Sequence, residues 1–470
     1  MVFSSNIFLF FFLPIVIFLY SVSSKGFRPF LLLLGSLFFY TWAQPKALGI
    51  LFIVCLINYI AAIWIEKAEN YKRYRKSILI LTCLFDIIVL GYYKYLNFFI
   101  DNINSFFYTH FPLHDLILPA GISFFIFQII SYVADVYFKK NKAQHNLNKF
   151  ILYISFFPQM IAGPIIRYKD MEKNLDCKNS SFDDIIYGTK RFVIGLGKKV
   201  LLANSLANIA DSIFNSGFSN IGFGVAWLGA IAYSLQIYFD FSGYSDMAIG
   251  LGRIFGFHFP ENFNFPYISK SITEFWRRWH ISLGSWFRDY VYIPLGGNRK
   301  GKLRTYINLG LVFLVTGMWH GANWTFILWG IWHGLFVIVE RLIGINKWPS
   351  NKNVFIRRVY TTFAFVIGWT MFRANSVTDG LGFISTMLGF YTPEYELFTI
   401  DYYLTFKNLV ILIVAIFFCT PFFNKIATKY QMDDSYMTLI AKNGCLIIIF
   451  VVSIIYMAAS TYTPFIYFQF

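Results

Sequence analysis

Residues 306–344 read YINLGLVFLVTGMWHGANWTFILWGIWHGLFVIVERLIG, two apolar runs separated by a short break at residues 321–323. An α-helix needs about 20 apolar residues to cross the hydrocarbon core of a bilayer, and shorter runs are still compatible with a tight hairpin. The first run ends at His320 and the second begins at Trp324. The pattern predicts a helical hairpin in a membrane protein, with a histidine at its tip.

The composition of the whole chain supports a membrane location. Of the 470 residues, 57% are hydrophobic and 14% are charged, and the mean hydropathy is +0.55. Soluble domains carry about 25% charged residues, so we expect an all-α polytopic membrane protein. Lys and Arg in cytoplasmic loops explain the net charge of +16, so we expect no nucleic-acid partner. The five cysteines have neither disulfide nor metal-ligand spacing: Cys55, Cys83, Cys177, Cys419 and Cys445.

Apolar segments of spanning length recur along the chain, and they predict about 11–12 transmembrane helices. The first segment lacks a basic flank and a clear cleavage site, so we interpret it as a retained helix rather than a signal peptide. We expect one membrane domain over 1–470, with N-terminal helices in 1–138, a core in 139–375 and C-terminal helices in 376–470. The segments are 7–22, 29–43, 47–65, 78–100, 117–138, 185–210, 223–250, 306–320, 324–344, 355–375, 406–423 and 443–462.

The charges of the loops predict the topology. Basic residues gather in 66–77, 139–149 and 250–304, whereas 101–116, 211–222 and 376–405 contain no Lys or Arg. The positive-inside rule places the first group in the cytoplasm and the second outside. Both termini then face outward from the cytoplasmic (inner) membrane.

Two segments depart from the pattern of simple spans. Residues 150–166 are apolar but contain Pro158 and are followed by basic residues. We interpret them as re-entrant; the alternative, a full span, would invert every later loop against its charge. Residues 252–304 mix aromatic and basic residues with Pro and Gly, which predicts short interfacial helices. Their expected apolar face consists of Trp276, Trp279, Leu283, Trp286 and Phe287.

Histidines supply the main candidates for chemistry, because an ionisable group in an apolar segment is costly and is therefore a functional hypothesis by default. His320 and His280 rank highest, and His333, within the second run of the hairpin, could act directly or only bridge helices. The other four, at 110, 114, 145 and 258, fit surface or interface roles. No HExxH, Cys/His cluster or Gly-x-Ser-x-Gly is present, so metal and serine-hydrolase chemistry are weakly supported.

A further polar element lies within the span at 223–250. Gln236 and Asp240 share one face of the helix at i,i+4, and a buried Asp240 needs a partner. We expect an arginine of the 277–288 group or an imidazolium, in a pair that is structural or catalytic. The full set of supporting or donor-binding candidates is Asp240, Gln236, Trp276, Arg277, Trp279, Ser282, Trp286, Arg288, Asp289, Trp319, Asn323 and His333.

Several long motifs, in order along the chain, resemble the membrane-bound O-acyltransferase family. The resemblance is closest to its bacterial polysaccharide branch, which includes the membrane subunits of alginate and peptidoglycan O-acetyltransferases, and it spans nearly the whole chain. The motifs are the run from Tyr238 to Ala248, the block from Trp276 to Tyr290, Pro294-Leu295-Gly296-Gly297-Asn298-Arg299, Trp319-His320-Gly321 and the ending from Pro464 to Phe470.

The resemblance implies a ring of tilted helices around a thin centre, with a funnel from each side. The nearly invariant histidine of the family maps onto His320, and its second polar position maps onto His280. The implied reaction moves an acetyl group from cytoplasmic acetyl-CoA, with no bound cofactor, to an extracytoplasmic polysaccharide, through an esterase-like periplasmic partner. His320 would act as general base or carry the acetyl group. D-alanyl transfer from a carrier protein to teichoic acid shares the fold, and a transporter or channel is the alternative from another class.

Overall fold

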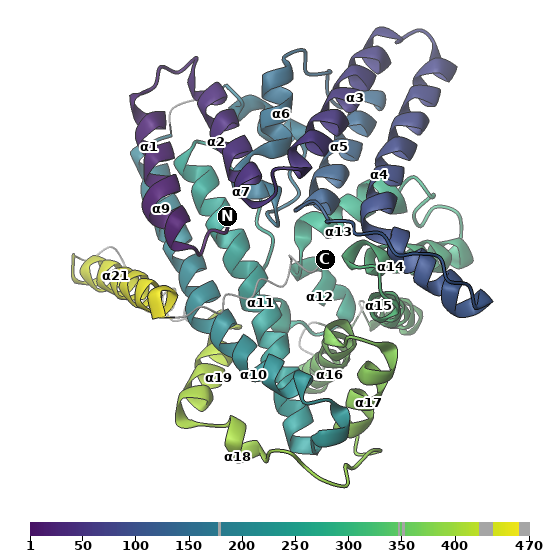
Figure 1. Cartoon of the computed structure of the whole chain (residues 1–470), viewed down its shortest axis with the longest axis vertical. Helices are drawn as coiled ribbons and strands as arrows, with labels where there is room; N and C mark the ends of the chain where they lie inside the picture. Colours follow the sequence, from purple (N-terminus) through teal and green to yellow (C-terminus); the bar gives the residue numbers. More distant parts are fainter. Residues whose placement is uncertain (177–179, 346–347, 350–352, 423–435, 460–470) are drawn as a thin grey trace. The chain divides into compact units, whose positions relative to one another are not determined.

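The computed structural model is all-helical: its described residues contain no strand (Figure 1). It describes residues 1–176, 180–345, 348–349, 353–422 and 436–459. Cys177, the ends of the spans predicted at 406–423 and 443–462, and the motif at 464–470 lie outside these ranges. The described chain forms two compact units.

The first unit comprises residues 1–192 and 244–260. Four of its long helices coincide with predicted spans, and α2 has Pro29 as its second residue, which suits a first helical turn. Its elements are η1 (Phe8–Phe12), α1 (Leu13–Val22), α2 (Arg28–Ala43), α3 (Ala47–Lys67), α4 (Lys72–Phe107), α5 (Ile122–Tyr137), α6 (Leu147–Ser155), α7 (Phe157–Met160), α8 (Tyr168–Met171), η2 (Glu172–Asn174) and most of α9 (Phe182–Gly197).

The segment predicted to be re-entrant is a broken helix in this unit. Helix α6 ends at Ser155, and α7 begins directly after Phe156, with Pro158 in its first turn. Every residue from 150 to 166 is buried within the protein. This burial provides the surroundings that irregular backbone needs at membrane depth; the depth itself stays a prediction.

The second unit comprises residues 193–243 and 261–470 and contains both leading histidines. Helix α11 runs from this unit into the first. The elements are η3 (Lys198–Ala203), α10 (Asn204–Asn215), η4 (Phe218–Asn220), α11 (Phe223–Ile254), η5 (Pro266–Ile268), α12 (Ile272–Arg278), α13 (Ile281–Phe287), η6 (Arg288–Tyr292), α14 (Lys302–His320), α15 (Trp324–Ile343), α16 (Val354–Arg373), α17 (Val377–Met387), α18 (Ile400–Tyr403), α19 (Phe406–Phe418) and α21 (Tyr436–Ala459).

Five helical stretches within the described ranges are long and apolar enough to cross a membrane. Shorter apolar helices of 10–17 residues lie at Phe8–Val22, Ile122–Tyr137 and Phe406–Phe418. The prediction of a polytopic all-α membrane protein is therefore confirmed. The five stretches are Ala47–Lys67, Lys72–Phe107, Phe182–Asn215, Trp324–Ile343 and Thr438–Ala459.

The short interfacial helices predicted within 252–304 are present as η5, α12, α13 and η6. Helix α12 starts at an N-cap, because Ser271 Oγ accepts a hydrogen bond of 3.0 Å from the amide of Glu274. Of the five residues of the predicted apolar face, four are buried and Trp276 is half-buried.

Candidate active site

The predicted hairpin is formed by α14 and α15, which pack closely because two glycines face each other. A Cβ atom on Gly317 would lie 2.4 Å from the carbonyl oxygen of Phe326, and one on Gly330 would lie 2.4 Å from that of Phe313. Small residues allow helix backbones in membranes to approach in this way. Asn323 caps α15 by accepting a hydrogen bond of 3.0 Å from the amide of Thr325. Together these contacts fix the tip that carries His320.

His320 is the last residue of α14 and is buried, with 3% of its surface exposed. Its ring is surrounded edge-on by aromatic rings, with centroid distances of 5.0 Å to Trp319, 4.9 Å to Trp329 and 5.2 Å to Phe372. The negative end of a helix dipole lies at the C-terminus. The imidazole is therefore enclosed by aromatic rings and lies at the negative end of the α14 dipole.

His280 occupies a strained position between α12 and α13. Its φ of 44° and ψ of 55° lie in the left-handed region, which is uncommon for residues other than glycine and often marks functional sites. Its Nδ1 lies 3.2 Å from Oδ1 of Asn262. The same Asn262 oxygen accepts hydrogen bonds from the amide and hydroxyl of Ser282, at 3.1 and 2.9 Å. Asn262 thus holds the turn, and no sequence motif had indicated it.

The structure brings the two histidines to one aromatic cluster. The Trp319 ring lies 6.1 Å from that of His280 and 5.0 Å from that of His320. Phe241 of α11 packs edge-on against His280 at 4.6 Å. Residues 40 positions apart in the sequence therefore meet around one indole, as expected for parts of a single site.

His333 lies one helical turn beyond Trp329 and is fully buried. Neither ring nitrogen has a hydrogen-bond partner among the described residues. Its neighbours are aromatic, with Trp276 at 5.1 Å and Trp329 at 5.2 Å, and a Cβ on Gly368 of α16 would lie 2.6 Å from its Nε2. This arrangement favours the interpretation of His333 as a packing residue between α12, α15 and α16.

Glu340 of α15, which sequence reasoning missed, anchors the start of α12. It is fully buried, and its carboxylate accepts hydrogen bonds of 2.5 and 2.8 Å from the amides of Ile272 and Thr273. The hydroxyl of Thr273 donates a third, at 2.6 Å. These amides are among the donors that a helix start leaves unsatisfied. Glu340 therefore sets the position of the helix that leads into His280.

A cleft of about 540 Å³ lies between α12, α13, α14 and α15, and His280 lines it. Most of the lining is apolar, but three arginines contribute to it: Arg277, Arg288 and Arg341. Arg288 pairs with Asp289 at 2.7 Å. Arg277 and Arg341 are exposed and have no ion-pair partner within the described ranges. An apolar cleft with two available guanidinium groups suits a ligand that combines an apolar arm with phosphates.

The expectation for the partner of Asp240 was wrong. Asp240 pairs with Lys199 of η3 at 2.7 Å, and the two side chains are 2% and 3% exposed. Neither an arginine of 277–288 nor an imidazole takes this place in the ion pair. Lys199 was overlooked because it lies in a predominantly apolar stretch. Gln236 is buried on the same helix, one turn before Asp240.

Burial lowers the pKa of the His280 imidazole from 6.5 to about 3, which gives a testable pH dependence. A buried neutral histidine stabilises the fold above pH 6.5 and loses that contribution as the pH falls toward 3, because the unfolded chain gains a proton first. Between pH 7 and pH 5, the contribution of His280 to the free energy of unfolding falls by about 2 kcal/mol. We expect His280→Asn, which tolerates the left-handed backbone, to remove this loss.

Thermal unfolding in detergent at both pH values measures the effect. The exposed-site variant His110→Asn is the control and should keep the wild-type pH dependence. Equal pH dependence in wild type and His280→Asn would contradict a buried, neutral imidazole.

Comparison with known proteins decides the family. The family model described as "MBOAT, membrane-bound O-acyltransferase family" matches residues 60–377. This range includes His280 and His320, the cleft and the hairpin. The chain belongs to the membrane-bound O-acyltransferase family. It is therefore a membrane-bound acyltransferase, and the transporter interpretation is not supported.

Full-length relatives of this acyltransferase modify polysaccharides. It is 42% identical to the probable alginate O-acetylase AlgI of Pseudomonas putida, over 100% of both chains. It is 34% identical to the peptidoglycan O-acetyltransferase of Helicobacter pylori, over 100% of this chain and 98% of that one. The teichoic acid D-alanyltransferase of Bacillus subtilis is 32% identical over 55% of this chain and 69% of its own. The predicted resemblance to the polysaccharide branch is confirmed.

Proposed function

We propose that this acyltransferase moves an acetyl group from cytoplasmic acetyl-CoA to an extracytoplasmic polysaccharide, with His320 as the catalytic residue. The observation that carries the proposal is the arrangement around the α14–α15 hairpin. The arginine-lined cleft runs along α14 as far as Thr316, and His320 follows one helical turn later. At a rise of 1.5 Å per residue, His320 lies roughly 6 Å farther along the helix axis.

The cleft suits the donor. The phosphates of CoA would bind Arg277 and Arg341, since guanidinium groups make charge-assisted hydrogen bonds to phosphate. The pantetheine arm would follow the apolar lining toward Thr316, which directs the thioester to His320. His280, on the wall of the cleft, would orient the thioester.

The chemistry then needs one base. The hydroxyl that accepts the acetyl group from CoA forms a bond to the acetyl carbonyl carbon, and the carbon–sulfur bond of the thioester breaks. His320 takes the hydroxyl proton and returns it to the CoA thiolate. The C-terminal position of His320 on α14 favours the positive charge that forms in between. The periplasmic partner then completes the transfer to the polysaccharide.

The relatives that match over the full chain favour acetyl transfer over D-alanyl transfer from a carrier protein, because one is named a probable alginate O-acetylase and the other a peptidoglycan O-acetyltransferase. A periplasmic partner that completes the transfer to the polysaccharide is part of the proposal, as is the orientation with both termini outside.

The test is label transfer from radioactive acetyl-CoA by the purified protein in nanodiscs, with partner and polysaccharide supplied. We expect acetylated product together with free CoA. Arg277→Ala and Arg341→Ala should each raise the KM for acetyl-CoA about tenfold, through loss of one charge-assisted contact. Arg304→Ala, an exposed residue of α14 outside the cleft lining, is the matched control.

Unchanged KM values in both arginine variants would remove the donor cleft from the proposal. Transfer that requires an acyl-loaded carrier protein, with no use of acetyl-CoA, would favour the D-alanyl alternative.

A further inference from the structure

Asn262 contacts the His280 turn at several atoms at once. It is fully buried, and its main-chain carbonyl accepts a 3.0 Å hydrogen bond from the amide of Ile281. Its side-chain oxygen, Oδ1, accepts hydrogen bonds from the amide and the hydroxyl of Ser282, at 3.1 and 2.9 Å. The Nδ1 atom of His280 lies 3.2 Å from the same oxygen. One residue therefore holds both the turn and one edge of the imidazole.

The amide of Ser282 decides which way the side chain of Asn262 faces. A main-chain N–H group can only donate a hydrogen bond, so the Asn262 atom that it meets is the carbonyl oxygen. The opposite orientation would set the NH₂ group of Asn262 against another donor. The Ser282 amide is held in place by the first turn of α13, where amides have no partner within the helix. The local backbone thus fixes Oδ1 as the atom that faces His280.

Oδ1 in turn decides where the neutral imidazole of His280 carries its proton. A neutral imidazole has one N–H group and one nitrogen with a lone pair, and a carbonyl oxygen can only accept. A lone pair on Nδ1 would face the lone pairs of Oδ1 in a buried place, where an unmet polar group is costly. The Ser282 hydroxyl lies 3.5 Å from Nδ1 but 2.9 Å from Oδ1, so it donates to Asn262. Nδ1 therefore carries the proton, and Nε2 has the lone pair.

We propose that Asn262 is a positioning residue for the acyl transfer, which holds neutral His280 with its proton on Nδ1 and its lone pair on Nε2. This inference rests on the function proposed above and specifies the part of His280 in it. In this state His280 can accept a hydrogen bond or a proton at Nε2, but it cannot donate one from Nε2 to the carbonyl oxygen of the thioester. His280 would therefore act in the donor cleft as an acceptor.

The first experiment measures the tautomer without any donor or activity. Histidine-labelled protein in lipid vesicles is studied by magic-angle-spinning NMR, because ring ¹⁵N and ¹³C shifts distinguish a proton on Nδ1 from one on Nε2. The signals of His280 are those missing from His280→Asn. We expect the proton on Nδ1 in wild type at pH 7. Asn262→Asp keeps an acceptor and should keep that proton, whereas Asn262→Leu should populate the form with the proton on Nε2.

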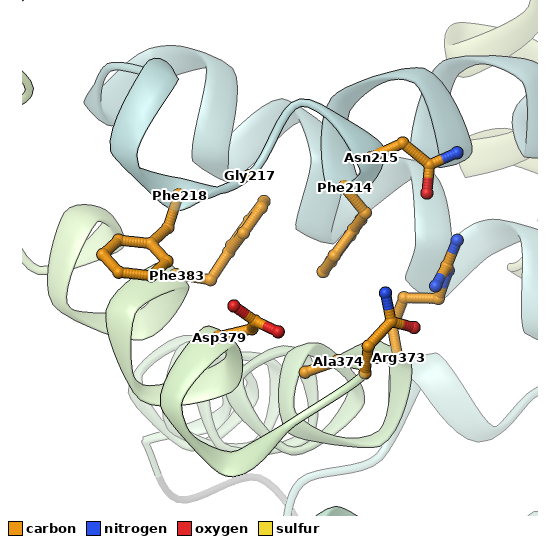
Figure 2. Close-up of a pocket in the computed structure, with 9 residues that line it drawn as sticks. Phe214, Asn215, Gly217, Phe218, Arg373, Ala374, Asp379 and Phe383 are labelled. Carbon is orange, nitrogen blue, oxygen red and sulfur yellow. The ribbon is translucent and has the colours of Figure 1, made fainter.

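The second experiment is a double-mutant cycle, which reports whether Asn262 acts through His280. Asn262→Leu should lower kcat/KM for acetyl-CoA about tenfold, the effect of losing one hydrogen bond. In a His280→Asn background the same change should cause no further loss, because the side chain that Asn262 positions is gone. Asn215→Leu is the matched control and should transfer acetyl groups like wild type. It makes the same replacement at an exposed residue of α10, which lines a separate cleft (Figure 2).

The outcomes separate this inference from the proposed function. A wild-type proton on Nε2, or a tautomer that Asn262→Leu leaves unchanged, would overturn the inference even if acetyl transfer proceeds. So would an equal loss of kcat/KM from Asn262→Leu in both backgrounds, which is the result expected of a merely structural residue. A proton on Nδ1 that depends on Asn262, in a protein that transfers no acetyl groups, would instead count against the proposed function and leave the tautomer assignment standing.

Discussion

Replacing His320 by alanine is expected to abolish measurable acetyl transfer while the protein remains folded. General acid–base help by a positioned side chain contributes about 10²–10⁴-fold to a rate. The loss should reach at least this range, because His320 lies at the end of α14 inside a rigid aromatic enclosure. The measurement is the initial rate of label transfer from acetyl-CoA, together with size-exclusion and thermal profiles that verify folding.

His333→Leu is the matched control for this substitution. His333 is also a buried histidine of the hairpin, and it packs against the same Trp329. Its ring nitrogens have no hydrogen-bond partner in the described part of the chain, so an apolar replacement removes packing only. We expect it to retain transfer within tenfold of wild type. A His320→Ala variant with near-wild-type activity would contradict the mechanism.

Breaking the buried pair of Lys199 and Asp240 is expected to have the largest effect on stability. Removal of one partner leaves an uncompensated buried charge, which costs about 3–5 kcal/mol. Lys199→Met should therefore lower the melting temperature sharply and reduce the yield of monodisperse protein. A double replacement of a buried pair by apolar residues is often neutral, so adding Asp240→Leu should restore both.

Activity of that double variant separates the two roles considered for Asp240. If Asp240 only locks helices, the double variant should transfer acetyl groups at a rate near that of wild type. A double variant that folds as well as wild type but transfers nothing would assign Asp240 to the chemistry. Single and double variants with equal melting temperatures would contradict the ion pair itself.

Local sequence patterns predicted much of the fold. The apolar runs located α14 and α15 to within a few residues, and the Gly-Ala-Asn break located the tip with His320. The Pro- and Gly-rich stretch from 252 to 304 predicted short helices, which α12 and α13 confirm. These features depend on hydropathy and on turn-forming residues, which act over short distances along the chain.

Long-range pairings could not be predicted in the same way. Asp240 meets Lys199 and not an arginine, because the choice depends on how η3 packs beside α11. Glu340 lies 68 residues from the amide of Ile272 that it binds. Arg341 joins Arg277 in one cleft although they lie on different helices. Only tertiary packing brings such groups together, and the spacing of residues in a single sequence does not predict which of them will pair.

The most direct measurement of the central claim is transfer across a sealed membrane. Vesicles with the cytoplasmic face of the enzyme inside would enclose labelled acetyl-CoA, with the polysaccharide and the periplasmic partner supplied only outside. We predict that label accumulates on the outer polysaccharide and that the free CoA formed stays enclosed in the vesicles. Vesicles with His320→Ala should show neither label transfer nor formation of free CoA. Label that appears only when donor and acceptor share one compartment would contradict the account.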